Sequence, residues 1–397
     1  MYVEALEDGM TVSFTKKASS GSLYYSLDKQ EWNEFTEAQT VNSGEKVYFK
    51  GDLVPASFNS IGTFAINKQC NVAGNTMSLL FVDSFVGKTS LTGYKHVFKN
   101  LFNNCTTIQS AENLILPATT LVDYCYNGMF SGCTGLTTAP ELPATKLALY
   151  CCTNMFFGCT NLTTAPTLPA TILASYCYRN MFDGCTSLTI TPELPVTTLA
   201  KGCYQSMFHN CTNLTTAPSL PATTLVDYCY TEMFSGCSSL TSAPELPSTT
   251  LATYCYQGMF QGCTSLTSAP ELPATTLANY CYQYMFSGCT NLITTPELPA
   301  TTLASSCYKN MFYGCTSLTT APELPATTLA SGCYTSMFNE CNNLNYIKML
   351  ATDISAGNCL YNWVKNVSST GTFIKADGVE IPTGVSGIPE GWTVQVA

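Results

Sequence analysis

A Met-Phe pair recurs every 26 residues, and this repeat constrains the fold more than any other feature of the chain. Nine copies follow one another without an insertion, and their phenylalanines are Phe130, Phe156, Phe182, Phe208, Phe234, Phe260, Phe286, Phe312 and Phe338. Degenerate copies stand at either end, around Phe102 and Trp363. A repeat of this length is typical of solenoids, in which each unit buries its apolar face only against its neighbours and the end units are atypical.

Within one copy the sequence predicts a helix and then a short strand. In LATYCYQGMFQG, Leu251, Cys255 and Met259 are four residues apart, and we interpret this apolar stripe as a helix of about ten residues. In the following CTSLTSAPELP, apolar and polar residues alternate, and Pro270 and Pro273 limit the strand to a few residues. We therefore predict an α/β leucine-rich-repeat solenoid with a short strand plus a helix in each 26-residue repeat.

The two ends of the chain lack the repeat. Residues 1–78 contain runs rich in Thr, Val, Tyr and Phe (MTVSFTKK, SLYYSLD, EKVYFKG and IGTFAIN) divided by turn sequences, and they predict a small β-sandwich domain. Residues 79–365 form the predicted solenoid. Residues 366–397 predict a C-terminal β cap, with a β-hairpin at Ala376-Asp377-Gly378 and Trp392 as a plug over the last repeat.

Composition and charge exclude several classes of function. Only 11% of the residues are charged and 46% are apolar, so the fold must be held together by packing. The net charge is −10, and no basic run occurs, which argues against nucleic acid and anionic membranes as partners. No stretch approaches the ~20 apolar residues of a transmembrane helix. The start, MYVEALEDGM, lacks the features of a secretory signal. Either the protein is exported without one or the native gene encodes one upstream, and we expect the second.

Twenty of the 22 cysteines fall into two columns of the repeat. One column is Cys125, Cys151, Cys177, Cys203, Cys229, Cys255, Cys281, Cys307, Cys333 and Cys359; the other is Cys105, Cys133, Cys159, Cys185, Cys211, Cys237, Cys263, Cys289, Cys315 and Cys341. We interpret them as buried thiols that fill the core, because free cysteine packs as a small apolar group. Disulfides within each repeat remain an alternative, since export permits them.

Neither metal binding nor catalysis is indicated. Structural zinc sites need close pairs of cysteines or added histidines, whereas the two columns are eight residues apart and the only histidines are His96 and His209. A nucleophilic cysteine needs a histidine within hydrogen-bond reach, and His209 stands at a variable position of the repeat. We therefore predict no catalytic residue, no metal ligand and no resident cofactor, and we expect the protein not to be an enzyme.

Two columns of the repeat are candidate binding residues. The first is a glutamate column, which would either form a solvated strip or dock a basic ligand or weakly held Ca²⁺; its members are Glu141, Glu193, Glu245, Glu271, Glu297 and Glu323. The second is a tyrosine column, which would either half-pack on its own neighbours or form an exposed aromatic row for sugars or protein; its members are Tyr124, Tyr150, Tyr176, Tyr228, Tyr254 and Tyr280.

The repeat resembles the BspA-like leucine-rich repeats of bacterial surface proteins. In the copy MFQGCTSLTSAPELP, the resemblance is carried by Phe260, Gly262, Cys263, Leu266, Thr267 and Pro273, and it extends over residues ~90 to 365. The unit here is longer than is usual in that family. The resemblance implies a secreted or cell-surface protein of host-associated anaerobes, linked with adhesion to host matrix proteins and to other bacteria.

We therefore expect an extracellular or surface-displayed, adhesin-like binding protein whose array is a rigid scaffold for a host protein, a glycan or a bacterial surface. One alternative is a receptor-binding tail or fibre protein of a phage or mobile element. Another is a structural spacer that holds the N-terminal β domain away from the cell. We expect a monomer. The sequence does not name the ligand or the face that binds it.

Overall fold

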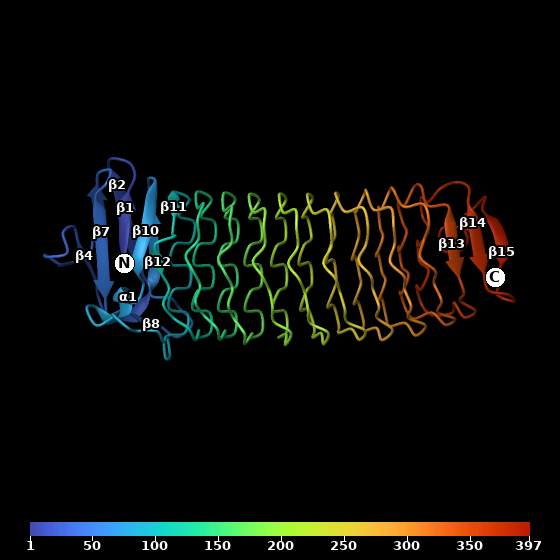
Figure 1. Ribbon diagram of the computed structural model, residues 1–397, viewed down its shortest axis with the longest axis horizontal. Coiled ribbons are helices and arrows are strands. Elements are labelled where there is room, and N and C mark those ends of the chain that lie inside the picture. The colour runs from blue at the N-terminus through green and yellow to red at the C-terminus, as the bar shows by residue number, and fades with distance from the viewer. The chain divides into compact units, whose positions relative to one another are not determined.

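The computed structural model describes residues 1–397, which form two compact units, Met1–Leu194 and Pro195–Ala397. The first unit holds the N-terminal domain and the first coils of the array, and the second holds the remaining coils and the C-terminal strands (Figure 1). Regular strands are confined to the two ends of the chain, and the only α-helix is α1, Ser78–Phe81.

The N-terminal domain is a β-sandwich, and the four strand-rich runs of its sequence are all strands. One sheet has the order β11-β10-β1-β7-β4-β5 with β12 also paired to β10, a second has the order β6-β2-β9, and β3 pairs with β8. The bounds are β1 Tyr2–Ala5, β2 Met10–Lys16, β3 Ala18–Ser20, β4 Leu23–Ser26, β5 Asn33–Glu34, β6 Gln39–Val41, β7 Lys46–Gly51, β8 Val54–Pro55, β9 Gly62–Ile66 and β10 Cys70–Asn75. Phe49 of β7 packs against Phe64 of β9 with ring centroids 4.9 Å apart, which joins the two sheets in one core.

The sandwich continues directly into the array within the first unit. Strand β10 pairs in parallel with β11 (Ile108–Ser110) and β12 (Leu114–Ile115), which belong to the first coil (Figure 1). The ring of Phe64 stacks on Phe102 at 5.6 Å, and Phe102 stacks on Phe130 at 5.4 Å, so the apolar ladder of the array begins inside the sandwich. The domain therefore provides the strand edge and the aromatic ring against which the first coil packs.

The predicted helix in each repeat is wrong, because the segment is a run of four-residue turns. Residues Tyr254, Gly258 and Gly262 have φ of +57°, +57° and +71°, and this left-handed conformation is incompatible with an α-helix. The backbone N–H groups alternate in direction: Cys255 donates to Ala252 in the same coil (3.2 Å), whereas the next residue donates to Cys281 in the following coil (3.1 Å).

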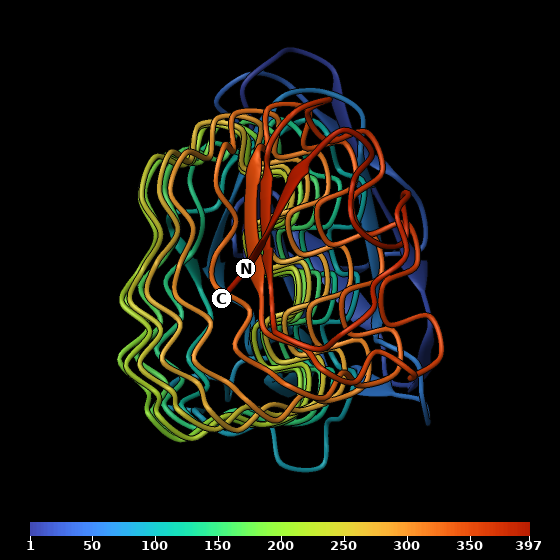
Figure 2. The same ribbon diagram turned by 90° about the vertical axis from the view of Figure 1, so that its right-hand side faces the viewer.

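The physical reason lies in the period of the apolar pairs. Cys255-Tyr256 and Met259-Phe260 are four residues apart, whereas an α-helix turns once in 3.6 residues, so the pairs would drift around a helix by about 40° per step. A turn unit of four residues instead points every pair inward. Seen along the stack in Figure 2, the coils of the second unit lie over one another, as this repetition requires.

The predicted short strand shrinks to isolated bridges between coils. In the second unit, parallel bridges join Ser268 to Thr294 and Thr250 to Thr276, on either side of the segment with the prolines. The architecture is still a repeat solenoid, but its units are held together by turns and single bridges.

Ladders of identical side chains fill the core of each unit. In the second unit, the rings of Phe234, Phe260 and Phe286 stack at 5.9 and 5.8 Å and are fully buried. A parallel ladder of buried tyrosines runs beside them, with Tyr256 5.9 Å from each neighbour, Tyr230 and Tyr282. Offset aromatic pairs add to the stabilisation that burial provides.

The C-terminal segment ends the array with a three-stranded parallel sheet. It has the order β13-β14-β15, with bounds Tyr346–Met349, Thr372–Lys375 and Thr393–Val396. Because β14 and β15 are parallel, the predicted hairpin at residues 376–378 is wrong, and the chain instead crosses back before β15. Trp392 is buried as predicted, and its indole Nε1 donates to Ser368 O at 2.8 Å.

We expect the aromatic ladder to dominate the stability of the second unit. Phe260→Ala removes a fully buried ring from the middle of the ladder, and it should lower the free energy of unfolding by about 3–5 kcal/mol. Thr267→Ala changes an exposed side chain of the same coil and should lower it by less than about 0.5 kcal/mol. Urea denaturation followed by near-UV circular dichroism measures both. Equal effects of the two substitutions would contradict a packed ladder.

Candidate functional site

The proline segment, Pro-Glu-Leu-Pro in most coils, interrupts the hydrogen bonds between coils, except near the end of the array, where Leu324 N donates to Lys348 O at 3.0 Å. Ala269 N donates to the next coil at 3.3 Å and Thr275 N to the preceding coil at 3.2 Å, but no backbone hydrogen bond joins residues 270–274 to a neighbouring coil. Two of these five residues are prolines, which lack an N–H donor. We call the aligned segments the PELP strip. Along most of this strip, no backbone hydrogen bonds hold neighbouring coils close to each other.

Three open clefts follow one another along this strip in the second unit. Their volumes are about 470, 430 and 390 Å³, and each lies between two successive coils. The walls are proline rings and the backbone beside them; the prolines are Pro244, Pro247, Pro270, Pro273, Pro296, Pro299, Pro322 and Pro325. Missing hydrogen bonds and rigid rings thus make a row of similar recesses.

The predicted glutamate column lies on the PELP strip, and all six side chains are exposed. Four of them line the clefts, two to each cleft, and these are Glu245, Glu271, Glu297 and Glu323. Lys348 forms an ion pair with Glu323 at 3.0 Å. In the first unit, Glu141 accepts a hydrogen bond from Thr167 at 3.0 Å, and Glu193 is exposed without such a contact.

Three successive carboxylates of the second unit have no partner within the chain. Glu245, Glu271 and Glu297 form neither an ion pair nor a side-chain hydrogen bond, and the clefts between them contain no basic side chain. Like charges on neighbouring coils repel one another at short range. The strip can therefore accept cations or hydrogen-bond donors without first breaking an internal contact.

The predicted tyrosine column forms two stacks, so the rings pack on one another and do not form an open row. Tyr124, Tyr150 and Tyr176 stack in the first unit at 5.0 and 4.9 Å, where His96 extends the stack, and the second unit stacks Tyr228, Tyr254 and Tyr280 at 4.9 and 4.6 Å. All six side chains are half-buried. Each ring face within a stack is covered by the next ring, which leaves edges and hydroxyl groups at the surface.

The tyrosine stacks have two further features, which are cation-π contacts with lysines and a left-handed backbone conformation. The Nζ atoms of Lys99 and Lys201 lie 5.8 and 5.4 Å from the ring centroids of Tyr124 and Tyr228, the first tyrosines of the two stacks. The six tyrosines have φ between +53° and +61°, a conformation that costs a residue other than glycine about 1–2 kcal/mol. Ring stacking and cation-π contact offset part of that cost.

Both cysteine columns are buried, as predicted, and the structure contains no disulfide. The thiols of the second column donate to a phenylalanine carbonyl of the preceding coil, for example Cys263 Sγ to Phe234 O at 3.2 Å and Cys289 Sγ to Phe260 O at 3.0 Å. They satisfy one backbone acceptor per coil in the core. Burial raises the pKa of Cys203, Cys281 and Cys289 to about 12, from an ordinary value of 9.0.

No group of three or more histidine, cysteine, aspartate or glutamate side chains lies close enough together to hold a metal ion. Weak Ca²⁺ binding at the glutamates therefore stays a prediction. A Ca²⁺ ion takes six to eight oxygen ligands, so the strip would have to add backbone carbonyls and water to its carboxylates.

The prolines that line the clefts were not predicted from the sequence as candidate site residues. Each copy repeats a Pro-x-x-Pro step at the same place, and this signal was used only to limit a strand. The same missing N–H donors that end the strand also open the clefts, so the pattern contained the information.

The chain resembles known sequences over most of its length. The profile of one family, the BspA type leucine rich repeat region, matches it in six copies, over residues 89–215, 126–267 and 255–370. The matches cover the whole array and more than half of the chain. No curated protein matches it. No helix of the protein has the length and apolar character that crossing a membrane would require.

We expect the stability of the protein to fall steeply above pH 9. The raised pKa values mean that the folded state keeps its thiol protons up to about pH 12, whereas the unfolded state loses them from about pH 9. The stabilisation by each buried thiol is thus complete below pH 9 and is lost as the pH rises toward 12, by about 1.4 kcal/mol per pH unit.

Urea denaturation at neutral pH and at about pH 10 measures this loss. Alkylation by iodoacetamide is the control, since the buried thiols should react only after the protein is unfolded. Unchanged stability at the higher pH, or rapid alkylation of the native protein, would show that the thiols are not held neutral in the core.

Proposed function

The chain belongs to the BspA-type leucine-rich repeat family, and on that premise we propose that it is a non-enzymatic, adhesin-like binding protein of the cell surface or the secreted fraction, with its ligand site on the PELP strip. Proteins of this family are commonly adhesin-like and surface-associated. The array is the scaffold, and the partner is an extracellular macromolecule with basic groups.

The observation that carries this proposal is the row of clefts with unpartnered carboxylates. Stable cores do not need surface recesses, and along the strip backbone hydrogen bonds between coils are absent except at Leu324. Each cleft offers two carboxylates between proline walls. A lysine or arginine side chain that enters such a cleft gains a charge-assisted hydrogen bond, which is stronger than one between neutral groups.

Repetition supplies the affinity that a single shallow cleft lacks. Because equivalent clefts recur on successive coils, a ligand with several basic groups engages several of them at once, and each later contact forms at a high effective concentration. The rigid ladders of the core keep the clefts in a fixed array, which lowers the entropic cost of binding. An extended, basic segment of a host matrix protein fits these requirements.

Saturable binding to basic extracellular protein tests this function. The labelled protein is presented to a panel of host matrix proteins, mucin glycans and intact bacteria, with Ca²⁺ and with chelator, at low and high salt. We expect binding to matrix protein that weakens with salt, since the contacts are between exposed charges. Binding only to bacterial cells would favour a fibre protein, and no binding at all would favour a spacer.

The triple variant Glu245→Gln, Glu271→Gln, Glu297→Gln tests the site itself. It removes the three unpartnered carboxylates and should weaken binding at least about tenfold, since hydrogen bonds to charged groups contribute about 1.5–3 kcal/mol each. The control is the variant Glu37→Gln, Glu380→Gln, Glu390→Gln, which makes the same charge change at exposed positions away from the strip. If both variants bind equally well, the PELP strip is not the ligand site.

A further inference from the structure

A separate cleft of about 430 Å³ lies in the N-terminal domain. It opens on the face of the sheet that points away from the sandwich core. Along β1 and β7 the side chains alternate, so Val3, Val47 and Phe49 are buried while Tyr2 and Tyr48 stand on the outer face, side by side across the two strands. The volume is in the range of small-molecule sites, roughly 300–1,000 Å³.

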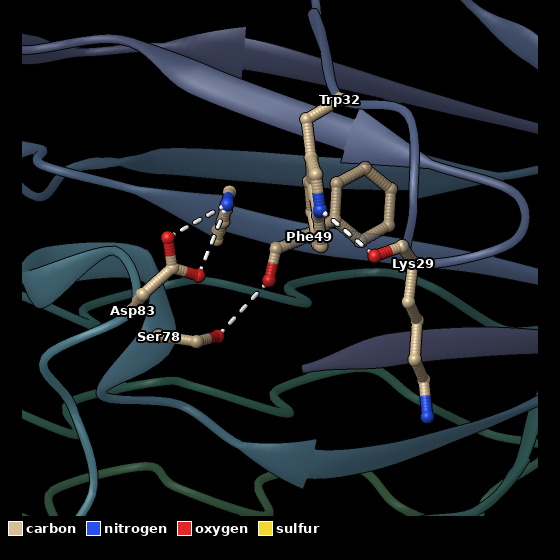
Figure 3. A network of polar contacts seen from close by, with 6 residues as sticks. Lys29, Trp32, Phe49, Ser78 and Asp83 are labelled. Atoms are coloured by element: carbon tan, nitrogen blue, oxygen red, sulfur yellow. Dashed lines mark hydrogen bonds and ion pairs between the residues drawn. The ribbon is translucent and has the colours of Figure 1, made fainter.

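Two segments form the sides of the cleft on this face. The loop between β4 and β5 provides Lys29 and Trp32, and the segment after α1 provides Asp83 (Figure 3). Phe85 of the same segment also lines the cleft. The loop is fixed by Trp32 Nε1, which donates to Lys29 O at 3.3 Å. The indole N–H is thereby engaged within the protein, and the ring contributes carbon surface to the cleft.

The floor of the cleft is also held by hydrogen bonds. Ser78 Oγ donates to Phe49 O at 3.0 Å (Figure 3). It also accepts a hydrogen bond from Met1 N at 2.7 Å. The positive charge of the cleft at neutral pH comes from lysines.

One of these lysines has no carboxylate partner. Lys50 is neutralised by Asp83, with Nζ to Oδ2 at 2.9 Å, and its Nζ also lies 4.3 Å from the ring centroid of Trp32. The Nζ of Lys29 is paired only with an aromatic ring, that of Tyr48, at 4.6 Å. Figure 3 shows the Lys29 ammonium group well apart from Asp83. The cleft therefore has an excess positive charge in a protein whose net charge is −10.

The cleft is also lined by polar groups that have no hydrogen-bond partner within the protein. The side-chain NH₂ of Asn75 has no partner in the chain, because the hydrogen bond of that side chain is made by its oxygen, which accepts from Met77 N at 2.9 Å. The hydroxyls of Tyr2 and Tyr48 likewise make no hydrogen bond within the protein. A ligand of this cleft must offer an anion to Lys29, hydroxyls to the polar groups and an apolar face to Trp32 and Phe85.

We propose that this cleft binds a sugar that carries a carboxylate, such as the terminal residue of an acidic glycan, with the carboxylate on Lys29 and the pyranose ring against Trp32. A sugar ring has an apolar face as well as hydroxyl groups, which matches a wall of aromatic carbon beside free donors. The site is independent of the PELP strip, since every residue that forms it lies in the N-terminal domain.

Titration with glucuronic acid and with N-acetylneuraminic acid tests the proposal, and glucose is the neutral control. Trp32 is half-buried whereas Trp363 and Trp392 are buried, so a change in tryptophan fluorescence reports on this cleft. Calorimetry gives the affinity. We expect saturable binding of at least one acid, with glucose at least about tenfold weaker, because it cannot form the charge-assisted contact.

Substitution of an exposed lysine separates recognition from folding. Lys29→Gln should weaken acid binding at least about tenfold, Lys29→Arg should retain it, and Lys17→Gln, the same charge change at an exposed site outside the cleft, should leave it unchanged. The glutamate triple variant of the strip should bind the acids normally. Equal binding of glucose and glucuronic acid, no saturable response to either acid, or wild-type affinity in Lys29→Gln would each overturn the proposal.

Discussion

The alternation of backbone hydrogen bonds is the constraint on which the structure depends. In each turn run, one N–H closes a local turn and the next donates to the following coil, as Cys255 and Tyr256 do. Half of the donors of that segment are therefore satisfied only when a neighbouring coil is present, and an unpaired buried donor is costly. No coil can be stable alone, so the array requires a template at one end and a cover at the other.

The two ends meet this requirement by different means. At the start, Phe64 of the sandwich is the first ring of the phenylalanine ladder, and its carbonyl accepts from Cys105 Sγ at 3.1 Å, as the carbonyls of the array do from later cysteines. At the end, Trp363 stands at the methionine position of the repeat, and its ring ends both the tyrosine and the phenylalanine ladder, at 6.3 and 6.1 Å from Tyr334 and Phe338. Each end segment thus forms the ring contacts of a coil with its neighbouring coil, although the rest of its structure differs from a coil.

The sequence predicted the architecture and the inward residues but not the local conformation. Exact spacing of Met-Phe and of the cysteines identified a solenoid with buried columns, since burial depends only on which residues share a face. The helix was wrong because a stripe at i and i+4 fits both a helix and a four-residue turn, and the distinguishing signal lay elsewhere. Gly, Asn and Tyr occupy the positions with positive φ. A column of glycines alone would have indicated left-handed turns, but the tyrosines in it made the segment look compatible with a helix.

Of the two candidate sites, the sequence predicted the glutamate column but not the N-terminal cleft. The glutamate column was found because charge in a fixed register is visible in one dimension, whereas the N-terminal cleft depends on the approach of residues 29–32 and 83–85, far apart in the chain. In the array, the coil separates two tasks. Its turn run makes the alternating hydrogen bonds between coils, whereas its proline segment makes few of them and contributes to the core only through residues such as Leu272 and Ala274. Thr167 and Ser219 replace glutamate there while the buried positions keep their chemistry, so the exposed side chains of the strip can change at little cost to the core.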